Sequence, residues 1–393
     1  MQLKSITNNI TMTIKHFACA AACTTLLSLP LTLMAQDDRL TVHGSINMAY
    51  AKTDGLPYFG ANKDGTTDYR VITLQFGYRI SQQDRVVVQL LSRKLGTSPL
   101  NDVTPEVQAV WAFYEHKFNS GVSVKLGRAP LPRGLFNEIR YIGTLLPLFR
   151  VGGTGVYGET FENIDGVVVA KKFDVGGDWA LETSAYGGGF NIKATLPTAA
   201  GLTVVNQRVE KTIGTQLLLV TPIRGVKAGA NVSSAQPTPA ATLADSARPK
   251  RLFSTVYSVE ADLDHAFARG EYTTYLSKGL LPADVTGWYL QAGVRPHEQV
   301  TVTAEYGALN STLRFPAPVI NEVVVPASRE FILGVAWKPS AQIAFKVEGH
   351  RYKGYAFDTP VATIIPPAGP PFRAGLAPAS RTNMLIASVA VSF

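Results

Sequence analysis

The clearest pattern in this chain is an alternation of apolar and polar side chains that begins at Leu40. Leu40, Val42, Ile46 and Met48 alternate with small or polar residues, so an extended segment here has one apolar side and one polar side. The same period of two residues recurs in the segments 72–80, 253–262, 288–295 and 300–306. Since no segment shows a convincing helical period, the pattern predicts an all-β protein whose strands each have one apolar face.

The lengths of the connections distinguish a soluble β-sandwich from a membrane barrel. Seven connections are short turns, at 81–84, 119–121, 176–178, 222–225, Asp264, 296–299 and 339–342. Eight long connections alternate with them, at 52–68, 94–106, 128–161, 188–207, 233–251, 277–286, 308–328 and 353–381. Fifteen connections join sixteen strands. Short periplasmic turns opposite long extracellular loops are typical of a transmembrane antiparallel β-barrel, whereas a sandwich has no reason to sort its connections by length.

Aromatic side chains lie near the ends of the predicted strands. Amphipathic rings at these places can sit at the lipid headgroups and form a girdle around a barrel. The alternative is that some of the rings pack on neighbouring strands or against another subunit. The set consists of Tyr50, Tyr78, Trp111, Phe113, Trp179, Tyr272, Trp288, Trp337 and Tyr352.

The last predicted strand ends on an aromatic residue. Leu385, Val389, Val391 and Phe393 share one face of an alternating segment. A terminal phenylalanine on such a strand resembles the assembly signal that the outer-membrane barrel machinery reads. The alternative is an edge-closing strand with a chance aromatic end.

Residues 1–35 are predicted to be a cleaved signal peptide. Lys15 and His16 precede the apolar run 17–29, Pro30 ends that run, and we expect cleavage after Ala35. The alternatives are a buried core helix or an N-terminal anchor, but the run is short for a membrane span. Abundant Gly and Pro and a charged fraction of 17% favour one large barrel over residues 36–393 rather than two or three soluble domains.

Removal of the leader also removes both cysteines and two positive charges from the chain. Cys19 and Cys23 both lie within it, so the mature chain needs no disulfide and no thiolate metal site. Loss of Lys4 and Lys15 lowers the formal net charge from +8 to +6. The remaining basic residues are scattered along the chain, and we expect no nucleic acid as a partner.

Residues 40–393 resemble the Gram-negative outer-membrane porins, closest to the general and phosphate-selective group of sixteen-stranded trimers. The residues that carry the resemblance are Leu40–Asn47, Lys125–Arg128, Pro132–Glu138, Glu305-Tyr306 and Phe393. The sequence departs from the group where 141–149 is unusually apolar and where a lysine-rich ladder is not visible, which leaves phosphate unsupported as a dedicated substrate. The resemblance implies a homotrimer in contact with outer-membrane lipid and lipopolysaccharide.

The predicted function depends on the size of the barrel. Sixteen strands enclose a lumen too wide for side chains to fill, so water occupies it and small hydrophilic solutes and ions can diffuse through. Porins narrow such a lumen by folding a long loop inward. The longest connection, 128–161, is therefore the candidate constriction; the alternatives are an external flap or a subunit contact.

The charges of this connection predict a modest anion preference. It carries Arg128, Arg133, Arg140 and Arg150 against Glu138 and Glu159, and charges at a narrow place select the ions that concentrate there. The alternative is that each arginine pairs with a lumen-facing carboxylate of the barrel wall. The candidates for such pairing are Glu260, Glu271, Glu305 and Glu348.

Enzyme readings have little support in the sequence. The mature chain has five histidines, none at metal-ligand spacing, and it lacks a nucleophile elbow, a P-loop and a dinucleotide fingerprint. We expect no catalytic residue, no metal and no cofactor. An outer-membrane barrel phospholipase or protease, whose Ser/His or Asp/His set is assembled from distant strands, is one alternative. A structural or adhesive barrel is the other.

Overall fold

The computed structural model describes residues 38–152, 156–157, 161–198, 201–238, 251–278, 283–315, 319, 321–365 and 372–393. The chain separates into two units, Met1–Thr41 and Val42–Phe393, and nearly all of the described residues belong to the second. The predicted leader, residues 1–35, lies outside the described residues. Among the described residues, no helix is long and apolar enough to cross a membrane.

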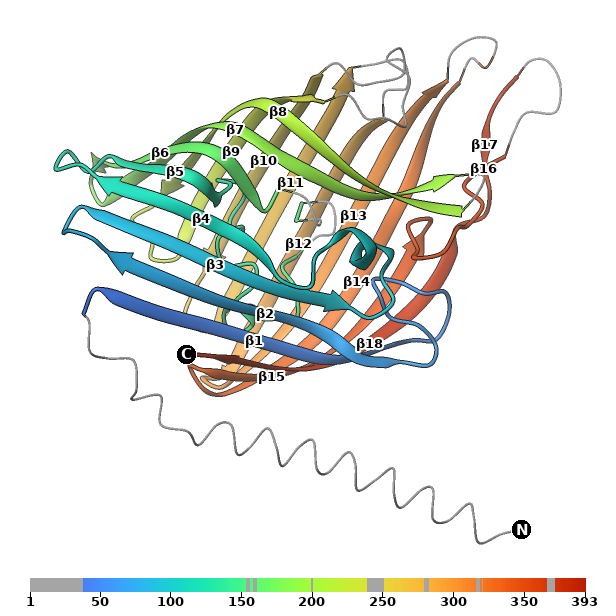
Figure 1. Cartoon of the computed structure of the whole chain (residues 1–393). Coiled ribbons are helices and arrows are strands. Elements are labelled where there is room, and N and C mark those ends of the chain that lie inside the picture. The colour runs from blue at the N-terminus through green and yellow to red at the C-terminus, as the bar shows by residue number, and fades with distance from the viewer. Residues whose placement is uncertain are drawn as a thin grey trace, which may run out of the picture. The chain divides into compact units, whose positions relative to one another are not determined.

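The second unit is a closed antiparallel β-barrel (Figure 1). Strand β1 pairs with β18 and closes the ring, with Met48 opposite Val389. The described residues contribute sixteen wall strands, which confirms the predicted number. These strands are β1 Leu40–Thr53, β2 Thr66–Arg79, β3 Asp84–Leu95, β4 Gln108–Lys117, β5 Ser123–Pro130, β6 Asn163–Gly176, β7 Trp179–Thr198, β8 Gly201–Val220, β9 Val226–Pro237, β10 Arg251–Asp262, β11 Ala266–Lys278, β12 Ala283–His297, β13 Val300–Phe315, β14 Asn321–Ser340, β15 Ile343–Gly354 and β18 Ser380–Ser392.

Smaller elements lie in the connections. Strands β16, Ile364–Ile365, and β17, Gly375–Leu376, form a separate two-stranded sheet between β15 and β18. Short 3-10 helices cover Pro99–Val103 and Gly143–Leu145. The second of these helices belongs to the connection between β5 and β6.

The two faces of the wall have opposite chemistry. On β12, Leu290 is 62% exposed whereas the next residue, Gln291, is 4% exposed; on β13, Tyr306 is 42% exposed and Glu305 is 4% exposed. Apolar side chains therefore cover the outside while polar side chains are buried inside, the reverse of a soluble protein and the arrangement of a membrane barrel. This confirms the predicted facing of these strands.

The seven predicted short turns are present, because each lies between two consecutive wall strands that pair as a hairpin. The turn between β8 and β9 needs a glycine. Gly225 has φ +81°, and a Cβ there would lie 1.9 Å from the carbonyl oxygen of Asp262. A larger residue would push this turn away from its neighbour.

Three predicted long loops are wrong in extent. The segment 188–207 is mostly strand, because β7 and β8 remain paired from Gly188 to Thr198 (Figure 1). Likewise β13 and β14 extend through most of 308–328, and β11 and β12 through most of 277–286. Main-chain hydrogen bonds hold such a hairpin together even where pairs are polar, as Lys193 opposite Asn206 shows. Loss of the apolar alternation therefore did not mark the strand ends.

The aromatic girdle is confirmed in part. Tyr50, Tyr78, Trp179, Tyr272 and Trp337 are exposed on the outer face. Two members of the predicted set are wrong, since Phe113 is 6% exposed and Tyr352 is fully buried. Their positions in the strand register turn both side chains inward, where they join apolar clusters of the interior. Trp288 packs on Tyr306 of the next strand, with 5.6 Å between ring centroids.

Candidate functional site

The connection between β5 and β6, which we call the 131–162 segment, makes the polar contacts from which the candidate site is built. Among the described residues of the segment, Arg133 is the most buried charged one, at 2% exposed. Its guanidinium donates hydrogen bonds to Ser254 on β10 at 2.9 Å, to Thr273 on β11 at 2.8 Å, and to the hydroxyl of Tyr275. The same group lies 4.4 Å from the ring centroid of Phe161. Arg133 therefore joins the start of the segment to two wall strands.

The backbone around Arg133 is also fixed to the wall. Asn231 on β9 donates to the carbonyl of Pro132 at 2.8 Å, and Gln216 on β8 donates to the carbonyl of Gly134 at 2.7 Å. Glu271 on β11 accepts the backbone N–H of Leu135 at 3.0 Å. Residues 132–135 belong to no helix or strand, so their backbone groups need partners elsewhere. Side chains of four neighbouring wall strands supply the partners of these backbone groups and of the Arg133 side chain.

A second group of contacts lies further along the segment. Lys346 on β15 is 1% exposed, and its ammonium donates to the carbonyls of Gly143 at 2.6 Å and Leu148 at 2.8 Å. Asn47 on β1 donates to the carbonyl of Phe149 at 3.2 Å. These bonds fix the short helix Gly143–Leu145 against strands on both sides of the β1 to β18 seam.

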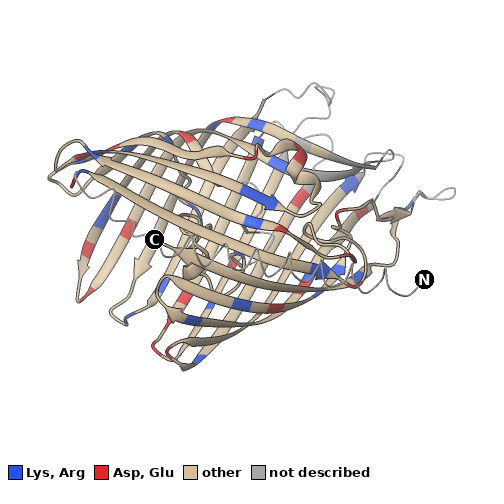
Figure 2. Cartoon of the chain, turned by 60° about the horizontal axis from the view of Figure 1, so that its bottom comes forward, with Lys and Arg blue, Asp and Glu red and all other residues tan. Residues whose placement is uncertain are grey.

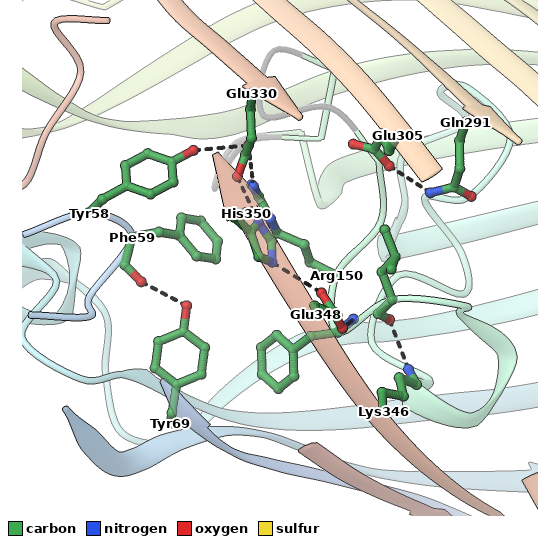
Figure 3. Close-up of polar contacts among 12 residues, drawn as sticks. Tyr58, Phe59, Tyr69, Arg150, Gln291, Glu305, Glu330, Lys346, Glu348 and His350 are labelled. Carbon is green, nitrogen blue, oxygen red and sulfur yellow. Dashed lines mark hydrogen bonds and ion pairs between the residues drawn. The ribbon is translucent and has the colours of Figure 1, made fainter. Parts of the chain in front are cut away.

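A buried carboxylate cluster lies next to this second group (Figure 3). The Glu330 carboxylate on β14 accepts Arg150 at 2.5 Å, the hydroxyl of Tyr58 at 3.0 Å, and contacts Nδ1 of His350 at 2.9 Å. The other ring nitrogen of His350 lies 3.3 Å from Glu348. The cluster joins the first long connection, the 131–162 segment and two wall strands at one point.

The protonation of this cluster depends on its partners. Burial alone would lower the pKa of Arg150, but the neighbouring Glu330 carboxylate raises it above its usual value. Burial, reinforced by Glu330, raises the pKa of Tyr58 well above its usual value. Arg150 therefore stays charged and Tyr58 stays a hydrogen-bond donor at neutral pH.

A cavity of about 530 Å³ borders both groups of contacts. Among the described residues that line it, ten are aromatic, four are cations and one is an acid. The cations are Arg93, Arg140, Arg150 and Lys193, and the acid is Asp358. Elsewhere on the wall, basic and acidic residues are interspersed (Figure 2). The lining is therefore apolar with a positive bias.

The five residues predicted for the constriction do not gather at one place. Arg140 and Arg150 line the cavity, while Arg133 is buried between the segment and the wall. Arg128 lies in β5 and pairs with Asp165 at 2.6 Å; Glu138 has an exposed side chain 3.7 Å from Lys125. Glu159 lies outside the described residues.

The four predicted lumen-facing glutamates are buried on the inward face, each with partners. Glu260 pairs with Lys227 at 2.9 Å and Arg269 at 3.3 Å, and Glu305 accepts Gln291 at 2.6 Å. Glu271 and Glu348 accept backbone N–H groups of the 131–162 segment. Arg150 of that segment pairs with Glu330, and Glu305 also interacts with it electrostatically.

Sequence reasoning missed several residues of the site: Arg93, Glu162, Lys193, Glu330 and Lys346. A signal for one of them was present. Lys346, Glu348 and His350 occupy alternate positions of one strand, so the inward face of that strand carries three polar groups in a row. The described residues hold no group of three or more His, Cys, Asp or Glu side chains that could bind a metal ion.

Comparison with known proteins gives the fold. No protein-family model and no curated protein sequence matches the chain. Among solved structures, the outer membrane channel DcaP of Acinetobacter baumannii matches with a TM-score of 0.57 at 11% identity, over 90% of this chain and 97% of that one. The fold is that of an outer-membrane porin.

Two further solved structures match similarly. The trimer form of OmpT, an outer membrane protein of Vibrio cholerae, has a TM-score of 0.56 at 11% identity, covering 90% of this chain and 99% of the other. The anion-selective porin from Comamonas acidovorans has a TM-score of 0.50 at 12% identity, with coverage of 90% and 99%. The chain thus has the fold of a porin-type β-barrel.

Proposed function

We propose that the chain is a passive diffusion channel for small hydrophilic solutes and ions. The support is a sixteen-stranded wall with a polar inner face, which in this fold encloses water. The proposal contains no catalytic step and no cofactor. Residues 1–35 act in it as the cleaved export signal, and residues 36–393 as a single barrel domain.

The 131–162 segment is the proposed constriction, because it is hydrogen-bonded to wall strands on opposite sides of the barrel. It accepts a hydrogen bond from Asn231 on β9 at Pro132 and from Asn47 on β1 at Phe149. Seven wall strands lie between β1 and β9 in either direction around the ring. A segment bonded to the inward side chains of opposite walls narrows the passage between them.

We also propose a modest anion preference, which rests on the charges that line the cavity. Arg128 pairs with Asp165, and Arg133 is buried and donates to hydroxyl groups of the wall, which favours structural roles for both. Four cations line the cavity against Asp358, and Glu162 and Glu330 pair with two of them, so one positive charge remains in excess and supports the preference instead. A fixed charge acts strongly where low-dielectric walls exclude water. The match to an anion-selective porin agrees with this sign.

The proposed assembly is a homotrimer embedded in outer-membrane lipid and lipopolysaccharide. The trimer form of OmpT among the matches and the porin resemblance of the sequence support it. In gel electrophoresis the unheated protein should migrate as an oligomer that heating converts to a monomer. A monomer before heating, in mild detergent, would contradict the trimer.

Planar-bilayer recording tests the channel. Purified protein should give stepwise current increments, and a KCl gradient should give a reversal potential with the sign for chloride preference. Stable insertion without current would contradict the channel and favour a structural barrel. Hydrolysis of phospholipid or peptide by the same preparation would instead favour the barrel-enzyme alternative.

A further inference from the structure

The cavity beside the 131–162 segment contains more aromatic surface than a passage for hydrated ions needs. Phe161 of the segment stacks on Tyr275 of β11, with 5.1 Å between ring centroids and 14° between planes. Phe190 of β7 packs on Phe161 at 5.2 Å. At another part of the lining, Tyr58 and Tyr352 stack at 4.0 Å. Aromatic rings from distant strands thus line one cavity.

Cations concentrate at the same cavity. Arg93, Arg140 and Lys193 line it, and all three interact electrostatically with Glu162, which lies 2.9 Å from the Arg93 guanidinium. Burial would raise the pKa of Glu162, but Arg93 and Arg140 hold it at about 2. One ionised carboxylate therefore faces three cations, which leaves an excess of positive charge at this edge of the cavity.

We infer that this cavity is a binding subsite for organic anions that carry an aromatic ring, of which a benzoate-type carboxylate is the simplest member. The inference rests on the proposed channel function and adds to it a class of solute. The carboxylate of the solute lies by Arg140 and Lys193, and its ring lies against the aromatic faces of the lining.

The size and chemistry of the cavity select this class. A volume of about 530 Å³ is within the ordinary range of small-molecule sites. An aliphatic anion gains the charge attraction but little from the rings, and a neutral aromatic compound gains the ring contact without the charge. An aromatic cation is repelled by the cations, and those rings that contact Arg93, Arg133, Arg140 or Arg150 already have a cationic partner.

The test compares four probes on the purified full-length mature protein in detergent by isothermal titration calorimetry. The probes are sodium benzoate, sodium acetate, benzyl alcohol and benzylammonium chloride at equal ionic strength. Benzoate should bind about ten-fold more tightly than either acetate or benzyl alcohol, because it makes both kinds of contact. Benzylammonium should bind more weakly than benzyl alcohol.

Two substitutions separate the contributions. Lys193→Gln should weaken benzoate binding about five-fold and leave benzyl alcohol unchanged, since it removes only charge. Phe190→Leu should weaken benzoate and benzyl alcohol alike and leave acetate unchanged. The matched control is Lys172→Gln, because Lys172 is an exposed lysine on β6 that does not line the cavity, and it should change none of these values.

Three results would overturn the inference: benzoate no tighter than acetate, benzoate no tighter than benzyl alcohol, or Lys193→Gln indistinguishable from Lys172→Gln. The channel is judged separately by KCl current in a bilayer. Current without selective benzoate binding removes the subsite and keeps the channel. Selective benzoate binding without current keeps the subsite and removes the channel.

Discussion

The outward and inward faces of one strand obey different rules, as β15 illustrates. Val347 is 55% exposed on the outside, whereas the next residue, Glu348, is 1% exposed and accepts the backbone N–H of Phe149. Lipid is a uniform solvent, so the outer face needs only an apolar side chain at every second position. Each inward polar group needs a particular partner from elsewhere in the chain. Outward positions therefore accept many different apolar side chains, whereas each inward polar position needs a particular side chain that fits its partner.

Loss of an inward partner should have the largest effect. Glu330→Ala leaves Arg150 and His350 without their shared carboxylate, and removal of one member of a buried ion pair costs about 3–5 kcal/mol. The free energy of unfolding from urea titration in detergent should fall by that amount. Glu182→Ala removes an exposed glutamate of β7 and should change it little; equal losses in the two variants would contradict the contrast between faces.

A charge on the outer face should have the next largest effect. Leu290→Arg places a guanidinium in lipid, which costs about 2–4 kcal/mol near the middle of the bilayer. The yield of heat-modifiable oligomer should drop, while Leu290→Phe, which changes shape but not polarity, should assemble normally. Normal assembly of Leu290→Arg would mean that this face does not contact lipid.

Release of one anchor of the 131–162 segment should have a smaller and more local effect. Lys346→Met leaves the carbonyls of Gly143 and Leu148 without their donor, at a cost of about 1–3 kcal/mol. Amide hydrogen exchange should accelerate over 143–149 and stay slow in the wall strands. Lys353→Met, at an exposed position of β15, the strand that carries Lys346, serves as the control and should leave that exchange unchanged.

The smallest expected effect is a pH dependence of the anion preference, caused by Asp358, the single acid among the described lining residues. Burial raises the pKa of Asp358 to about 6, although the N–H of Gly60 donates to its carboxylate and opposes the shift. Because Asp358 is ionised above that pKa and neutral below it, the cavity becomes more positive as pH falls from 7 to 5. Anion preference, measured as a reversal potential, should rise over that interval. Asp358→Asn should remove this part of the pH dependence, and an unchanged dependence would contradict the assignment.

The sequence predicted the wall well and the site poorly, for one physical reason. The period of two and the short turns are local properties, so residues such as Leu290 and Gln291 reveal their faces without knowledge of the partners. The pairing of Arg150 with Glu330 spans 180 positions of the chain and depends on the path of the 131–162 segment. The contact of Lys346 with Gly143 likewise exists only in the closed ring of strands, so local sequence does not reveal it. The predicted strand ends around 188–207 were wrong because β7 and β8 stay paired beyond the point where the apolar alternation stops.

Cysteine modification tests most directly whether the 131–162 segment narrows the channel, as we propose. The two native cysteines lie within residues 1–35, the proposed leader, so a single introduced thiol is unique in residues 36–393. Leu145→Cys places it on an exposed position of the segment, and Val259→Cys places it on the outer face. A negatively charged methanethiosulfonate reagent should reduce the open-channel current of the first variant and leave that of the second unchanged. Complete labelling at position 145, verified by mass spectrometry, with no change in current would contradict the claim.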